Sequence, residues 1–78
     1  MSKDNITIHI GGLAKPLIEQ VAEQGYRFKD ARDCAVFENH IEQVTRLMFA
    51  FLITNTEANR IFGRITKAIG RAVKKVET

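Results

Sequence analysis

The longest regular pattern of apolar and polar positions in the chain lies between Asp30 and Ile53. Its apolar residues are three and four positions apart, which on an α-helix places them in one continuous stripe: Cys34, Phe37, Ile41, Val44, Met48 and Phe51. In the first half of the segment the other positions are polar, so one face meets protein and the other meets water. From Leu47 to Ile53 every residue is apolar. This pattern predicts a helix over residues 30–53 whose second half is enclosed by protein on all sides.

A second copy of the chain is expected to complete that enclosure. The chain has 78 residues and one cysteine, so it has no disulfide of its own. A lone core of this size rarely supplies more than about 3–5 kcal/mol. We therefore predict a homodimer or a larger oligomer, with these residues at the interface: Ile6, Ile8, Ile10, Phe37, Ile41, Val44, Met48, Phe51 and Leu52.

The segment before the long helix predicts a strand followed by a shorter helix. Residues 5–10 alternate between polar and β-branched apolar side chains, which is typical of a strand with three isoleucines on one face. A helix is predicted over residues 13–24, with Pro16 in its first turn and Gly25 as its stop. Asp30 is the predicted N-cap of the helix that follows.

The last third of the chain predicts a strongly amphipathic helix. Thr54 and Glu57 have the spacing of a capping box, which favours a separate helix over residues 55–76, although one helix continuous with the preceding one stays open. Gly63 and Gly70, seven residues apart on one flank, fit either the close approach of another backbone or chance. The basic residues lie opposite the isoleucines: Arg60, Arg64, Lys67, Arg71, Lys74 and Lys75.

Charge is distributed unevenly along the chain. The net charge is +3, but residues 1–54 carry six Lys and Arg against seven Asp and Glu, whereas residues 55–78 carry six against two. Such asymmetry indicates a nucleic acid, a membrane surface or an acidic protein as the partner.

No constellation of catalytic or metal-binding residues stands out in the sequence. His9 and His40 are isolated, and Cys34 belongs to the apolar stripe, where an unpaired cysteine acts as a small core residue. We expect no enzymatic activity, no metal and no cofactor. The single cysteine and the absence of an apolar leader in residues 1–5 favour the cytoplasm, and the run from Leu47 to Ile53 is too short to span a bilayer.

Residues 5–44 resemble the ribbon-helix-helix family of DNA-binding proteins. The similarity rests on Ile6-Thr7-Ile8-His9-Ile10 followed by the helical stretch from Leu17 to Gly25. The resemblance implies that two copies pair their N-terminal strands into a ribbon that enters the major groove, with Asn5, Thr7 and His9 reading base edges. It also implies a phosphate contact at the start of the second helix, where Asp30 and Asp33 stand and Arg27 or Lys29 would supply the positive charge. The expected fold is therefore mostly α: one short N-terminal β-strand and three helices, as a ribbon-helix-helix-like dimer with an extra basic helix.

The leading interpretation is a small dimeric, DNA-binding regulator of the kind carried by phages and plasmids. The ribbon would read bases, and the basic face of the last helix would add phosphate contacts. One alternative is a phage- or mobile-element-encoded helical protein that docks on an acidic surface of a host protein and inhibits it. The other is a peripheral membrane-binding protein. The membrane ranks last, because the Ala- and Ile-rich face of the last helix is needed for packing.

Overall fold

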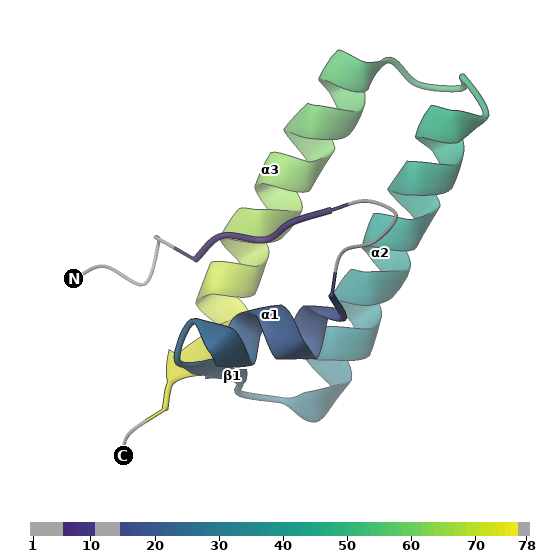
Figure 1. Ribbon diagram of the computed structural model, residues 1–78. Coiled ribbons are helices and arrows are strands. Elements are labelled where there is room, and N and C mark those ends of the chain that lie inside the picture. Colours follow the sequence, from purple (N-terminus) through teal and green to yellow (C-terminus); the bar gives the residue numbers. More distant parts are fainter. Residues whose placement is uncertain (1–5, 11–14, 77–78) are drawn as a thin grey trace.

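The computed structural model describes residues 6–10 and 15–76. The described chain contains α1 (Leu17–Glu23), β1 (Tyr26–Phe28), α2 (Ala31–Phe49), α3 (Asn55–Ala72) and β2 (Val73–Lys75). α2 and α3 form an antiparallel hairpin (Figure 1), and α1 lies across it near the end where the two strands pair. We call this end the base, comprising α1, β1 and β2. The turn at the opposite end, residues 47–56, is the tip.

The predicted N-terminal strand and ribbon-helix-helix-like arrangement are wrong. The sheet of the described chain has two antiparallel strands, and its first strand, β1, lies in the middle of the sequence between α1 and α2. Tyr26 is opposite Lys75, and Phe28 is opposite Val73. β2 therefore takes up residues that the sequence assigns to the end of the last helix. The fold remains mostly helical, with three helices and this small sheet.

Residues 6–10 are extended, but they dock onto α1 of their own chain. The side-chain amide of Gln24 accepts a hydrogen bond from the Thr7 backbone N–H (2.8 Å) and donates to the Thr7 carbonyl (2.6 Å). Gln20 makes the same pair of bonds with His9, at 2.7 and 3.0 Å. Residues four apart on a helix rise by about 6 Å, and residues two apart in a strand rise by nearly 7 Å. The spacings match, so two glutamine side chains occupy the place of a partner strand.

The ends of the long helices are set by their capping residues. The Asp30 carboxylate accepts from the Arg32 N–H at 3.0 Å, which confirms Asp30 as the N-cap of α2. The Thr54 hydroxyl accepts from the Glu57 N–H at 3.0 Å, so α3 is a separate helix. α2 ends at Phe49, four residues before the predicted end. α1 begins at Leu17, directly after Pro16, rather than at residue 13.

The core lies where α1, residues 6–10 and the two strands close over the α2–α3 hairpin. Ile69, Val21 and Val73 are completely enclosed. The apolar stripe of α2 packs here too: Val44 is buried, and Phe37, Ile41 and Met48 pack against the cluster while partly buried. Much of the stripe that the sequence assigns to a second copy therefore has an intramolecular partner.

Candidate nucleic-acid interface

The outward side of α3 carries four cations in one row. Arg60, Arg64, Lys67 and Arg71 are spaced four, three and four residues apart and are all exposed. At 3.6 residues per turn their directions fall within about 60° of one another. The opposite side of the same helix holds four of its five buried residues, Ala58, Phe62, Ile65 and Ile69, and the fifth, Gly70, lies on a flank. The packing of α3 against the core therefore holds the row toward solvent.

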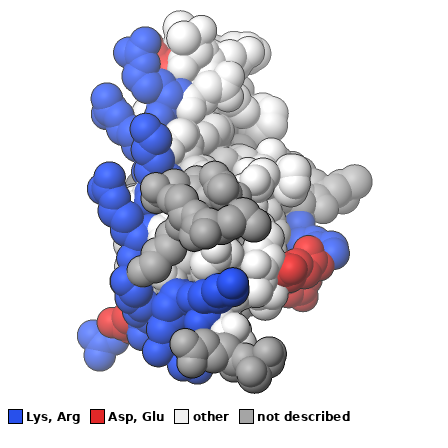
Figure 2. Space-filling view, turned by 90° about the vertical axis from the view of Figure 1, so that its left-hand side faces the viewer, with Lys and Arg blue, Asp and Glu red and all other residues white. Residues whose placement is uncertain are grey.

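The two strands at the base extend this row. β2 continues directly from α3, and its Lys74 lies opposite Arg27 of β1 in the register of the sheet. The Lys29 ammonium donates to the Arg71 carbonyl at 3.1 Å, which holds Lys29 against the end of α3. In Figure 2, Lys and Arg form a nearly continuous band along one edge of the molecule and across its lower end. We call the following residues the basic face: Arg27, Lys29, Arg60, Arg64, Lys67, Arg71, Lys74 and Lys75.

The cations of the basic face form no ion pair with a carboxylate among the described residues. The ion pairs of that part of the chain are Lys15–Glu23 and Arg46–Glu42, neither of which belongs to this face. The Glu23 carboxylate accepts a hydrogen bond from Lys15 and raises the pKa of that ammonium group. Arg27 and Lys74, by contrast, are like charges directly across a strand pair, an arrangement that destabilises a sheet. An anion bound between them would remove that repulsion.

Two surface hollows open on the basic face. One, of about 330 Å³, is lined by Ile6, Thr66, Lys67, Gly70 and Arg71. The other, of about 380 Å³, is lined by Arg27, Lys74, Lys75 and Val76. Each hollow presents at least two cations, so each offers a place for a phosphate group.

The structure separates the residues predicted to read bases. Asn5 lies outside the described residues. Thr7 and His9 both have exposed side chains, and the segment that carries them crosses α3 (Figure 1). Thr7 directly follows Ile6, which borders the hollow with Lys67 and Arg71, whereas His9 borders a different hollow, about 450 Å³ in volume, beside α1 and α2. Neither side chain lines a hollow of the basic face, and Thr7 is the one that adjoins a lining residue in sequence.

The residues predicted at the oligomer interface also divide into two groups. Ile6 is buried, and Ile8 and Ile10 pack partly buried against the core, as do Phe37, Ile41 and Met48, while Val44 is buried. Phe51 and Leu52 are instead 94% and 71% exposed at the tip. The tip is therefore the part of the predicted interface that the chain itself leaves uncovered.

Gln20 and Gln24 are structural residues that the sequence pattern does not single out. Gln20 is 7% exposed and the sole polar residue buried in the described chain, and both glutamines hold residues 6–10 on α1. Two glutamines four residues apart on a short helix are the signal that could have indicated them.

Cys34 is half-buried on α2, and its Sγ lies 3.8 Å from a Glu38 carboxylate oxygen. Burial, together with that carboxylate, raises the pKa of the thiol. A raised pKa keeps the group protonated and poorly nucleophilic near neutral pH.

In the ranges that the structure describes, no three His, Cys, Asp or Glu residues are grouped to hold a metal ion. None of the three described helices is long and apolar enough to cross a membrane. No protein-family model matches the chain, and no curated protein or solved structure matches it.

Proposed function

We propose that this protein binds duplex DNA through the basic face, as a small non-enzymatic regulator. The observation that carries the proposal is the row of exposed cations on α3, which the sheet extends and which forms no ion pair with a described carboxylate. A duplex carries one negative charge per about 1.7 Å of its axis, and Lys and Arg that neutralise phosphates release bound counterions.

The dimensions of the row suit a phosphate backbone. From Arg60 to Arg71 the helix rises by about 16 Å, and Lys74 and Lys75 lengthen the row beyond the end of α3. Side chains that project from a rigid helix meet the backbone without ordering a loop. Such contacts position a protein on DNA and give affinity for any sequence, whereas base-edge contacts give discrimination. Thr7 is exposed and directly follows Ile6, which lines the hollow with Lys67 and Arg71, and it is the proposed base contact.

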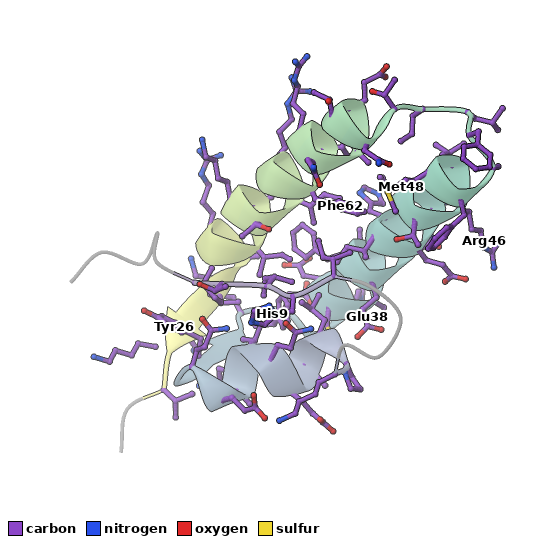
Figure 3. The ribbon with its side chains drawn as sticks, turned by 45° about the horizontal axis from the view of Figure 1, so that its top comes forward. His9, Tyr26, Glu38, Arg46, Met48 and Phe62 are labelled. Carbon is purple, nitrogen blue, oxygen red and sulfur yellow. The ribbon has the colours of Figure 1, made fainter. Side chains whose placement is uncertain are left out.

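Fluorescence anisotropy with a random-sequence duplex tests the proposal. With six or more phosphate contacts, affinity falls by about 10³-fold or more between 50 and 200 mM salt. Arg64→Ala and Arg71→Ala should each weaken binding and reduce the salt slope by about one unit. Arg46→Ala is the matched control: it removes one arginine from α2, where the side chain pairs with Glu42 and points away from α3 (Figure 3).

The control should bind DNA as the wild type does. The absence of wild-type binding at the lower salt concentration would exclude the proposal. Equal losses in Arg46→Ala and Arg71→Ala would show that net charge, rather than the basic face, determines affinity. Thr7→Ala should bind random DNA normally and lose about 1–3 kcal/mol of preference on a selected site.

A further inference from the structure

Four large apolar side chains that are close in sequence are exposed at the tip. Phe51 is 94% exposed, Phe49 72%, Leu52 71% and Leu47 39%. Their neighbours Met48 and Ile53 pack against the core, so the backbone of the turn is anchored while these four side chains project outward. Single exposed apolar residues are ordinary, but four within six consecutive positions form a patch.

The backbone of Phe51 shows that its side chain is not placed there for the fold. Phe51 has a φ of 57°, in the left-handed region where a bulky residue is unfavourable. The N–H groups of Leu52 and Phe51 bond to the carbonyls of Leu47 (2.9 Å) and Met48 (3.1 Å). This is a Schellman motif, in which the position of Phe51 is usually glycine. An exposed phenylalanine costs conformational energy here and gains no packing, so its benefit lies in a contact outside the chain.

The tip is free of charge, which bears on the identity of that contact. Residues 47–56 contain no Asp, Glu, Lys, Arg or His. An uncharged surface has nothing with which to select an acidic or a basic partner. Two identical uncharged surfaces can pack across a twofold axis without like-charge repulsion, as an isologous interface requires. Two basic faces brought together would repel each other.

The exposed area is close to what a small specific interface needs. A phenylalanine side chain presents about 150–250 Å², so the four exposed side chains offer on the order of 500 Å² per copy. Two tips in contact would bury at most on the order of 1,000 Å² in total, which is the threshold for a specific protein–protein interface and fits a weak dimer.

We infer that the tip is a self-association surface, on which the occupant is the tip of a second copy of this chain. Phe49, Phe51 and Leu52 form its centre. The interface is small and apolar, so the dimer dissociates on dilution and forms without DNA. The inference is independent of the proposed function, because the basic face and the tip share no residue.

Sedimentation velocity without DNA, from about 1 µM to about 1 mM protein, tests the inference. The wild type should pass from monomer to dimer over this range. Phe51→Gly should associate at least tenfold more weakly, and its unfolding free energy in dilute solution should not fall, because glycine suits the left-handed backbone. Val36→Ala removes a half-exposed apolar side chain from α2 outside the tip and should associate as the wild type does.

A wild type that stays monomeric throughout, or a Phe51→Gly variant that dimerises equally well, would overturn the inference. Flotation with phosphatidylcholine vesicles, with and without an anionic lipid, tests whether the tip binds a lipid membrane instead of a second copy. The protein should remain in the aqueous fraction. A monomeric wild type that floats, and a Phe51→Gly variant that does not, would assign the tip to lipid instead.

Discussion

Two helices of this protein are each followed by a residue with a left-handed backbone conformation. One of these residues is a glycine and the other is a bulky phenylalanine. α1 is followed by Gly25, with a φ of 87°, and α2 by Phe51, with a φ of 57°. At Gly25 the chain turns into β1, and the Gly25 carbonyl accepts a hydrogen bond from the Val76 N–H at 2.8 Å. At Phe51 the chain turns through the tip, and the side chain projects into solvent.

The difference shows that the base and the tip are under different constraints. At the base, the Gln24 and Gly25 N–H groups bond to carbonyls of α1, and glycine is the residue that the conformation favours. At the tip, the Phe51 and Leu52 N–H groups likewise bond to carbonyls of α2, yet the residue is one that the conformation disfavours. The base is explained by folding alone, whereas the residue at the tip is the one that the inferred self-association would explain.

The largest expected difference is between the unfolding free energies of two truncations, one of a core side chain near the base and one of a side chain at the tip. Ile69 is completely buried, so Ile69→Ala should lower the unfolding free energy by about 2–5 kcal/mol through lost burial and a residual cavity. Phe51→Ala should change it by less than about 0.5 kcal/mol in dilute solution. Urea unfolding at a concentration where the protein is monomeric measures both. Similar losses at the two sites would show that the tip belongs to the core.

The next effect concerns the glutamines that hold residues 6–10. Gln20→Ala should cost about 1–3 kcal/mol, because buried Gln20 bonds to both backbone groups of His9 and to the Lys15 carbonyl. Gln24→Ala should cost less, about 0.5–1.5 kcal/mol, because its bonds to Thr7 are exposed to water. Amide hydrogen exchange at His9 should accelerate in Gln20→Ala. A larger loss in Gln24→Ala would contradict this ranking.

The sequence predicts the parts of the fold that depend on local periodicity and capping. The stripe of α2 and the opposite faces of α3 follow from three- and four-residue spacing, and Asp30 and Thr54 mark where these helices begin. Residues 6–10 have the alternation of a strand, but alternation does not say what pairs with the backbone. Here side chains of α1 do so, and residues 6–10 are not part of the sheet in the described chain.

The sheet could not be predicted, because it depends on contacts distant in sequence. Tyr26–Phe28 is only three residues long, and Val73–Lys75 also continues the amphipathic pattern of the helix before it. Pairing between the two segments makes them strands. The cations of α3 in the candidate site follow from helical spacing. That Arg27 lies opposite Lys74 follows only from the register of the sheet.

Exchanging the residue type at the two helix ends should give effects of opposite sign. Gly25→Ala should destabilise the fold by about 1 kcal/mol, because its φ is left-handed, although a methyl group there would meet no atom within 4 Å. Phe51→Gly should stabilise the monomer by up to about 1 kcal/mol. Thermal unfolding of dilute protein measures both, and Gly25→Asn, which tolerates this backbone better, should lose less. A destabilised Phe51→Gly monomer would show that the phenylalanine serves the fold after all.

A further small effect is expected at Gly63, which lies inside α3 between the tip and the base. Neither reason for a glycine applies there: its φ is not left-handed, and a methyl group would meet no atom within 4 Å in the described chain. Gly63→Ala should therefore stabilise the fold by about 0.5–1 kcal/mol, through the lower helix propensity of glycine. Because Gly63 lies outside the tip, sedimentation should show unchanged association. A variant that is more stable as a monomer but associates less would show that a partner backbone approaches α3 at Gly63, and would extend the interface from the tip along the helix.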